Sequence, residues 1–280
     1  MKSPVLSILF LLISVTLLAV PNDFRFRHFS VEDGLSSNSV RAIMQDKYGF
    51  LWIGTEEGLN RYDGIMIKSY SICPQAAGKY ISSLYGTKKN IWIGTDEGIY
   101  IYAYATETFT YFDLTTPNNV RITSIVNHIL QDKDGNLWFS TNGQGLFRYN
   151  LSKNYLEQYE FTSAFGIVAS TMADSDNQIW ALTNQGESGV YKLNKAENKF
   201  EPFGLLYNAG NHHSQALAML EDSEQTLWLG TWECGLQKID KYTRQTTTYL
   251  HPTDGKGVTH IHSLMEYAPH QLLIGSDDGL

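Results

Sequence analysis

The sequence predicts an all-β fold, a β-propeller built from four-stranded antiparallel blades. A Trp-containing phrase recurs along the chain at intervals of 40 to 48 residues, a repeat length that fits one blade of four strands. Each copy contains short apolar segments separated by turns rich in Gly, Asp and Asn, and it lacks the long 3.6-residue periodicity of a helical repeat. The 23 glycines and 17 tyrosines, against only seven prolines in 280 residues, also favour many short strands joined by tight turns.

Residues 1–20 are interpreted as an export signal that is separate from the fold. Lys2 precedes an apolar run over 5–20, which is shorter than the about 20 residues of a membrane span. A short basic start followed by such a run is typical of secretory signals. Because the cleavage site is poorly defined, an uncleaved N-terminal anchor stays open as the alternative. We assign residues 21–280 to an exported, incomplete propeller.

The folded part begins with an outer segment and then divides into repeats. FRFRHFS at 24–30 has the character of an outer strand without inner strands before it, so we expect it to complete the last blade of an intact ring. The sixth repeat ends just after its second turn, which predicts an incomplete sixth blade. The predicted blades cover residues 39–71, 80–112, 122–161, 167–203, 214–250 and, incompletely, 258–280.

Each repeat has the same internal order, which the first one illustrates. The apolar segment VRAIMQD at 40–46 leads through the polar turn KYGF into the Trp segment LWIGT, a Gly/acid turn, the alternating segment LNRYD and the aromatic segment IKSY at 67–70. Four short strands joined by hairpin turns are the expected result. The tryptophans should pack between neighbouring blades, where an indole buries roughly 150–250 Å². These structural positions are Trp52, Trp92, Trp138, Trp180 and Trp228, with Leu273 in the sixth repeat.

The inner strands should carry small side chains near the ring axis and larger ones further out, because blades are wedges. One column of residues is mostly small, and the column two places later is large. The expected small column is Ala42, Ser82, His128, Ser170, Ala218 and Ser263, and the expected large column is Met44, Leu84, Leu130, Met172, Leu220 and Met265.

The turn before the tryptophan resembles the Asp-box of sialidase propellers, D-x-G-x-x-W, as in DKDGNLW at 132–138. A carboxylate in such a turn caps the hairpin and lies away from chemistry. We therefore predict that these acids are turn residues, and the few scattered arginines provide no sialidase arginine triad. The acids are Asp46, Asp132, Asp174 and Asp222.

Acidic turns and a histidine pair raise the question of a metal site. Turns such as Glu56-Glu57 and Asp277-Asp278 are spread around the ring, whereas a metal ion needs several ligands that converge. His260 and His262 share one face of a strand and are a conceivable metal pair, but no third ligand is evident. The prediction is hairpin acids, unliganded histidines, and no metal or other cofactor.

Residues 26–64, FRHFSVEDGLSSNSVRAIMQDKYGFLWIGTEEGLNRYDG, resemble the opening of the two-component regulator propeller family, and the repeated phrase extends the resemblance over 24–280. That family forms the periplasmic sensor region of hybrid histidine kinases, with two seven-bladed propellers and a small β-sandwich before a membrane span and a kinase core. It senses glycan fragments and controls polysaccharide-utilisation genes. The resemblance implies a periplasmic ligand-sensing propeller that is part of a seven-bladed ring, with inner-membrane tethering as an option. It also implies an oligosaccharide ligand, a second propeller and a kinase region as partners, and a homodimer as a further option.

Composition and motifs argue against several other functions. The net charge of −8 disfavours a nucleic-acid partner, which needs a basic face. No GxSxG elbow, phosphate-binding loop or HExxH motif occurs, and kinase motifs are missing, so this chain is not predicted to be an enzyme. Besides the ligand sensor, two alternatives stay open: a secreted propeller enzyme acting on glycans, such as a lyase, and a protein-interaction scaffold. Propellers host all three functions, so the fold does not choose among them.

The ligand-binding candidates lie in the turns that depart from the repeated EEG pattern. Amides and an exposed aromatic ring suit sugars, through hydrogen bonds to hydroxyls and stacking on an apolar face. Trp232 is the one tryptophan outside the structural positions and is the first choice. The full set is Trp232, Glu233, Asn142, Gln144, Asn184 and Gln185, with His212 and His213 in a polar loop; no catalytic residue is predicted.

Overall fold

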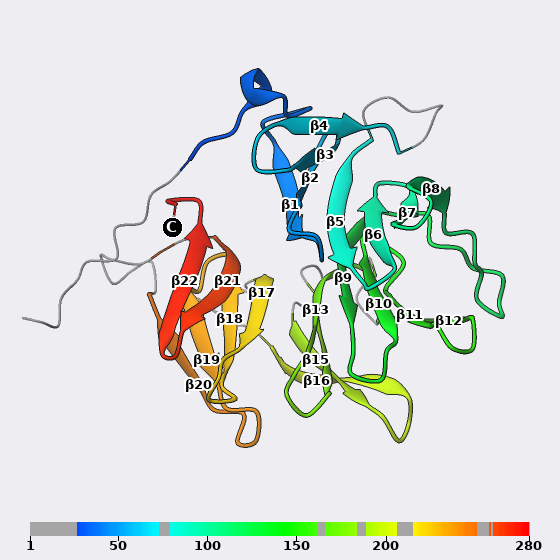
Figure 1. The fold of residues 1–280 in the computed structure, drawn as a ribbon. Helices are drawn as coiled ribbons and strands as arrows, with labels where there is room; N and C mark the ends of the chain where they lie inside the picture. The colour runs from blue at the N-terminus through cyan, green and yellow to red at the C-terminus, as the bar shows by residue number, and fades with distance from the viewer. Residues whose placement is uncertain are drawn as a thin grey trace, which may run out of the picture.

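The computed structural model describes residues 27–72, 79–161, 166–183, 189–205, 215–250, 258 and 260–279 (Figure 1). Within these ranges the chain forms five four-stranded antiparallel sheets and one two-stranded sheet, with one 3₁₀ turn, η1 (Val31–Asp33), before the first strand. Each sheet occupies one copy of the sequence repeat, and the predicted all-β blade fold is confirmed. The predicted export signal lies outside the described residues.

Within each sheet the strands lie side by side in sequence order, and each pairs antiparallel with the next. The first three sheets contain β1 (Val40–Gln45), β2 (Leu51–Thr55), β3 (Gly58–Tyr62) and β4 (Ile67–Tyr70); β5 (Ile81–Gly86), β6 (Asn90–Thr95), β7 (Gly98–Ala103) and β8 (Thr108–Tyr111); and β9 (Val126–Gln131), β10 (Leu137–Thr141), β11 (Leu146–Asn150) and β12 (Tyr155–Tyr159). The other three contain β13 (Val168–Ala173), β14 (Ile179–Thr183), β15 (Gly189–Asn194) and β16 (Lys199–Leu205); β17 (Ala216–Glu221), β18 (Leu227–Thr231), β19 (Leu236–Ile239) and β20 (Thr246–Tyr249); and β21 (Ile261–Ala268) and β22 (Gln271–Ser276).

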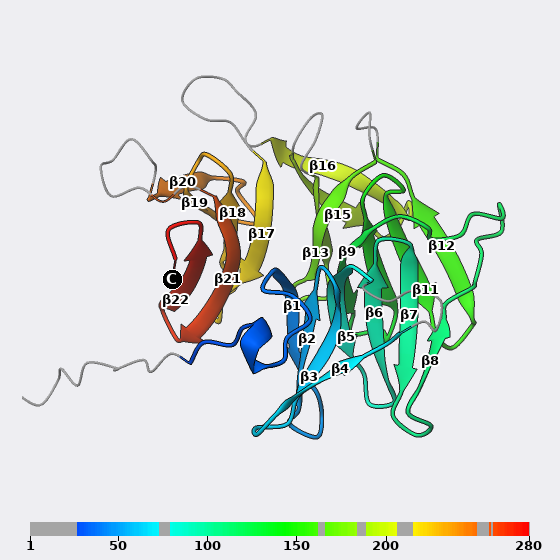
Figure 2. The ribbon, with the colours of Figure 1, turned by 90° about the horizontal axis from the view of Figure 1, so that it is seen from above.

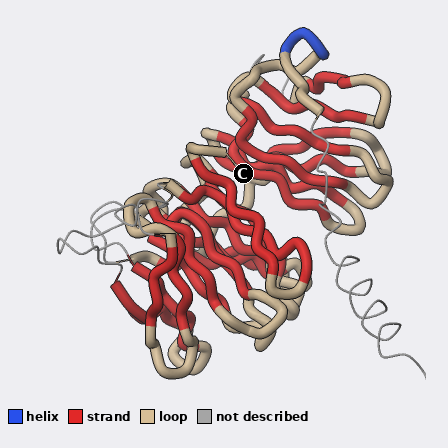
Figure 3. The backbone as a smooth tube through the Cα atoms, turned by 90° about the vertical axis from the view of Figure 1, so that its left-hand side faces the viewer, coloured by secondary structure: helices blue, strands red, loops and turns tan. Residues whose placement is uncertain are grey.

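The sheets follow one another in an arc around a common centre, with the first strand of each sheet innermost (Figures 1 and 2). Consecutive inner strands contact each other, from β1 through β5, β9, β13 and β17 to β21. Figure 3 shows the strands running between turns at both ends of the sheets. At the two ends of the arc, Ile43 of β1 is 65% exposed and Met265 of β21 is 59% exposed, because no further sheet covers them in the described part of the chain.

A buried carboxylate links the first hairpin of a sheet to its tryptophan. In the third sheet, Asp132 Oδ1 accepts a hydrogen bond from the Asn136 N–H at 2.8 Å, and Oδ2 accepts one from the Trp138 indole N–H at 2.8 Å. The ring of Trp138 then packs among residues of the fourth sheet. The prediction that these acids are turn residues is confirmed. The same indole–carboxylate bond, at 2.7–3.0 Å, joins Asp46 to Trp52, Asp174 to Trp180 and Asp222 to Trp228.

The second sheet departs from the expected alignment because its first hairpin is one residue shorter. Trp92 lies opposite Tyr85 rather than opposite Leu84, whereas the tryptophans of the other four-stranded sheets lie opposite the expected large residues. Ser83 and Tyr85 therefore occupy the positions that were expected for Ser82 and Leu84. The two columns are otherwise in the predicted register, including Ser263 and Met265 in the sixth sheet.

The shorter hairpin also removes the carboxylate. Thr87 stands where the other sheets have Asp, and its hydroxyl bonds within the turn, to the Asn90 carbonyl at 3.0 Å. The indole N–H of Trp92 is buried and has no hydrogen-bond partner among the described residues. The second blade therefore keeps the packing role of its tryptophan without the hydrogen bond that fixes the others.

Residues 27–30 form no strand in this chain, and the expectation that segment 24–30 completes the last blade of an intact ring stays a prediction. Arg27 donates a hydrogen bond to the Tyr62 hydroxyl at 2.9 Å, and the Phe29 ring lies 4.8 Å from the Tyr62 ring, so residues 27–30 lie against the first sheet. An outer strand needs a third strand beside it, and the sixth sheet contains only β21 and β22 in the described residues. Without that neighbour, this segment has no edge to pair with.

The second and third sheets allow a matched test of the indole–carboxylate bond. Trp138→Phe removes the donor and leaves buried Asp132 short of a partner, whereas Trp92→Phe removes an N–H that has none. We expect Trp138→Phe to lower the free energy of unfolding by about 1–3 kcal/mol more than Trp92→Phe does. Urea unfolding followed by circular dichroism measures both, and equal losses would contradict a stabilising role for the bond.

His128 on β9 makes the fold sensitive to mild acid. Its Nδ1 is shielded from solvent and has no hydrogen-bond partner in the described residues, and burial lowers the pKa of the imidazole. The unfolded chain takes up the proton near the ordinary value of about 6.5, whereas the folded chain resists it until the pH is lower. The stability that neutral His128 contributes is therefore present above about pH 6.5 and is lost as the pH falls below it.

We expect the melting temperature to fall between about pH 7 and pH 5, and His128→Gln to flatten that dependence. His270→Gln is the matched control, because the His270 side chain is 69% exposed, and it should leave the slope unchanged. Differential scanning calorimetry across this range makes the measurement. A slope that His128→Gln leaves intact would assign the sensitivity to another group.

Candidate functional site

Four side chains from the fifth and sixth sheets meet at the end of the sheets that carries the Gly/acid turns. Trp232 directly follows β18, His260 directly precedes β21, His262 lies within β21, and Asp277 directly follows β22. Because β21 and β22 are antiparallel, with Ile261 opposite Ser276, the start of one strand adjoins the end of the other. This register brings Asp277 to the two histidines, and we name the four residues the His–Trp cluster.

The cluster is held together by ring stacking and by a shared carboxylate. Asp277 Oδ1 bonds to His262 Nε2 at 2.7 Å, and Oδ2 bonds to His260 Nδ1. The His260 ring lies over the Trp232 ring, with centroids 3.9 Å apart and 33° between their planes. The His260 N–H also donates to the Trp232 carbonyl at 3.0 Å, which joins the fifth sheet to the sixth.

The local backbone and charges prepare the cluster for polar contacts. Hydrogen bonds from His260 and then from His262 hold the pKa of Asp277 below its ordinary value, so this carboxylate is ionised at neutral pH. His260 has a left-handed backbone, with φ of 52°, a conformation that costs energy outside glycine and often marks a functional position. Trp232 is 39% exposed. Together they offer solvent an aromatic face beside imidazoles and a carboxylate.

Asn142 and Gln144, the two candidates in the turn between β10 and β11 of the third sheet, have different environments. Gln144 Oε1 accepts hydrogen bonds from the Thr123 and Ser124 N–H groups at 2.9 and 3.0 Å, and its Nε2 donates to the Arg121 carbonyl at 2.9 Å. Its amide therefore holds the loop before β9 and is not available to a ligand. The side chain of Asn142 is exposed at the equivalent end of β10.

Of the other sequence candidates, Trp232 and Glu233 are neighbours in the turn after β18, and both are exposed. Four candidates lie outside the described residues, namely Asn184, Gln185, His212 and His213. Sequence reasoning missed that Asp277 completes a site with His260 and His262, because it treated the acid as a hairpin residue and the histidines as a separate pair. The predicted hairpin contained the signal for this contact. In an antiparallel hairpin the start of the first strand, next to His260, faces the end of the second strand, next to Asp277.

Two further searches cover only the described part of the chain. Among these residues, no group of three or more His, Cys, Asp or Glu side chains is arranged to hold a metal ion. In the His–Trp cluster, the carboxylate oxygens of Asp277 already lie on the ring nitrogens of the histidines. No helix in the described ranges has the length and apolarity that a membrane span requires.

Comparison with known proteins supports the family resemblance. Residues 34–57 and 120–143 match the family described as two component regulator propeller. A 68-residue stretch of the chain is 46% identical to part of histidine kinase P4 of Formosa agariphila. This stretch covers 24% of this chain and 5% of that protein. The resemblance to this family is thus confirmed over repeated segments of the chain.

Solved structures share the fold over most of the chain. An extracellular domain assigned to a hybrid two component system of B. thetaiotaomicron matches with a TM-score of 0.73 at 24% identity, covering 90% of this chain and 34% of that one. Virginiamycin B lyase of Staphylococcus aureus matches with a TM-score of 0.65 at 16% identity, covering 84% and 77%. At these identities the likeness establishes the fold and not the activity. The chain spans about a third of the matched extracellular domain.

The different duties of Gln144 and Asn142 can be tested directly. Gln144→Ala leaves two backbone N–H groups and one carbonyl without their partner, so we expect it to lower the free energy of unfolding by about 1–3 kcal/mol. Asn142→Ala removes an exposed side chain and should change it by less than about 0.5 kcal/mol. Chemical denaturation of both variants makes the comparison, and a larger loss in Asn142→Ala would reverse this assignment.

Proposed function

We propose that this chain is the ligand-sensing part of an exported sensor and that it binds an oligosaccharide at the His–Trp cluster. The observation that carries the proposal is the exposed Trp232 ring, which His260 holds beside His262 and Asp277. An aromatic face stacks on the apolar face of a sugar ring, while imidazole and carboxylate groups bond to its hydroxyls. Glu233 and Asn142 extend the candidate surface along the same end of the sheets.

The remaining parts of the proposal rest on the family resemblance. Residues 1–20 direct export to the periplasm. In the alternative form of the proposal they stay uncleaved and tether the chain to the inner membrane. A kinase region outside this chain reads the bound state and controls polysaccharide-utilisation genes, and a second propeller or a second copy of the chain completes the sensor. The chain itself performs no catalysis. The match to the two component regulator propeller family and the relative named a histidine kinase support this assignment.

Ligand binding at the cluster would act on the contact between two sheets. The His260 N–H bonds to the Trp232 carbonyl, so one ligand touching both rings contacts the fifth and the sixth sheet together. A ligand shifts a conformational equilibrium only by its difference in affinity for the two states. A sugar that fits one spacing of these rings better than another would therefore bias how the two sheets pack.

Binding of a panel of oligosaccharides, followed by thermal shift and then calorimetry, tests the site. We expect at least one member to stabilise the chain and Trp232→Ala to weaken its binding by about tenfold or more, which is about 1.4 kcal/mol. Tyr242→Ala is the matched control, because Tyr242 is an even more exposed aromatic of the fifth sheet, at 76%. A flat response to the whole panel, or equal losses in both variants, would refute the sugar site.

A lyase-like enzyme acting on glycans is the second candidate, and one observation favours it. Asp277 bonds to both imidazoles, and a carboxylate-oriented imidazole can serve as a general base. The fold likeness to virginiamycin B lyase is compatible with such a site. Turnover of an oligosaccharide that is lost in His262→Ala would assign the enzyme, whereas binding without turnover assigns the sensor.

A further inference from the structure

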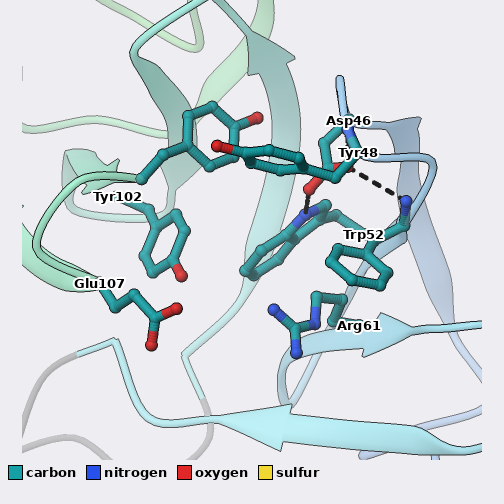
Figure 4. A pocket seen from close by; sticks show the side chains of 8 residues that line it. Asp46, Tyr48, Trp52, Arg61, Tyr102 and Glu107 are labelled. Atoms are coloured by element: carbon teal, nitrogen blue, oxygen red, sulfur yellow. Dashed lines mark hydrogen bonds between the residues drawn. The ribbon is translucent and has the colours of Figure 1, made fainter.

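A pocket (Figure 4) lies between the first and second sheets, at the end of the sheets opposite the His–Trp cluster. It has a volume of about 240 Å³, which suits one sugar-sized ring better than a longer ligand. Its walls are mostly aromatic and carry one cation, Arg61, and two carboxylates, Asp46 and Glu107. The residues used below are Tyr48, Phe50, Trp52, Tyr104, Arg61 and Glu107.

Arg61 brings to this pocket a guanidinium that no side chain of the described residues holds in an ion pair. Its guanidinium lies over the Phe50 ring at 4.5 Å and the Trp52 ring at 5.7 Å, and it makes no hydrogen bond or ion pair with the described residues. Directly across the strand pair, the neighbour of Arg61 is Lys68, a second cation. The donors of the guanidinium therefore remain available, and the cross-strand charge repels rather than neutralises it.

The equivalent pocket between the third and fourth sheets shows what a satisfied arginine looks like. There Arg148 lies across from Glu157 in the same register and forms an ion pair with it. Asn198 donates to Glu157 at 2.6 Å and accepts from the Tyr159 hydroxyl at 2.7 Å, which closes the network. That pocket is smaller, about 140 Å³. The first sheet keeps the arginine and replaces its glutamate by Lys68.

Of the two carboxylates in the pocket between the first and second sheets, Asp46 is engaged by its hairpin and Trp52, whereas Glu107 is left open. Glu107 holds the turn position of Asn198, with a similar left-handed φ of 54°, and its carboxylate has no partner among the described residues. Figure 4 shows Glu107 and Arg61 on opposite sides of the pocket. The Tyr104 hydroxyl is buried without a partner, and burial, followed by the charge of Asp46, raises its pKa to about 12, so this side chain forms an uncharged aromatic part of the wall.

We propose that this pocket binds a hexuronate, a sugar ring that carries a carboxylate. The carboxylate would pair with Arg61, close to Lys68, in the way that guanidinium groups bind carboxylates. The ring would lie among Tyr48 and the neighbouring aromatic side chains, and its hydroxyls would donate to Glu107. A neutral hexose would leave Arg61 unpaired, and a carboxylate without hydroxyls would leave Glu107 unpaired, so these two open groups together select an acidic sugar.

Titration of the chain with glucuronate, glucose and benzoate tests the ligand class. We expect glucuronate to bind saturably, with a Kd on the order of millimolar for one ring in an open pocket. Glucose and benzoate should each bind at least about tenfold more weakly. Equal binding of glucose would overturn the role of Arg61, equal binding of benzoate would overturn the recognition of hydroxyls, and absence of glucuronate binding would overturn the site.

Two variants and one control locate the binding. Arg61→Gln should weaken glucuronate binding by about tenfold or more, while Arg148→Gln, the matched arginine with a partner, should leave it within about twofold. Lys68→Glu copies the third sheet and supplies Arg61 with a partner, so it should abolish binding without lowering the melting temperature. Glucuronate binding that survives Lys68→Glu, or that Arg148→Gln reduces as much as Arg61→Gln does, contradicts the proposal.

This site stands apart from the His–Trp cluster, and its test is independent. Trp232→Ala should leave glucuronate binding at Arg61 unchanged, and Arg61→Gln should leave the response to the oligosaccharide panel unchanged. Loss of glucuronate binding in Trp232→Ala would place the acidic sugar at the cluster and overturn the second site.

Discussion

The hydrogen bond between a buried carboxylate and an indole fixes the tryptophan in four of the five four-stranded sheets, and the packing of the blades is built around that ring. A carboxylate taken out of water is costly unless its oxygens are engaged. Asp132 engages one oxygen with the backbone of its own hairpin and the other with Trp138, so one residue closes the turn and fixes the ring. Arg148 lies over the same indole at 5.6 Å. Because the ring forms the surface on which the next sheet packs, each blade positions its neighbour.

That constraint acts at one end of the sheets and leaves the other end open to variation. There a hydroxyl holds the turn: Thr231 accepts from the Cys234 N–H at 2.9 Å and donates to the Gly235 carbonyl at 2.7 Å. Gly235 has a φ of 66°, and a Cβ there would lie 2.5 Å from the Leu250 carbonyl oxygen, so glycine is required. With the turn secured by these residues, the next position can differ between sheets, as Glu56, Asn142, Trp232 and Asp277 do.

The sequence predicted the blades well because their determinants are periodic and local. It misaligned Ser82 and Leu84 because a hairpin one residue shorter shifts the register without changing the Trp phrase. It also proposed Gln144 as a ligand residue, since an amide in a turn shows nothing of the backbone groups it will bond. The contact of Asp277 with His260 and His262 depends on the register of two strands. The sequence shows this contact only when the residues of the two strands are paired in that register.

The two candidate sites lie where a repeated position has changed its cross-strand partner. In the third sheet, Arg148 keeps Glu157 and is structural, whereas Arg61 faces Lys68 and retains its donors. At the other end, Arg41 pairs with Glu56 in the first sheet, and the matching positions of the sixth sheet hold His262 and Asp277. The strand register is the same in each comparison, so the change of partner follows from the side chains at these positions. In a repeat protein, comparing its own blades in register therefore separates the residues that hold the fold from those available to a ligand.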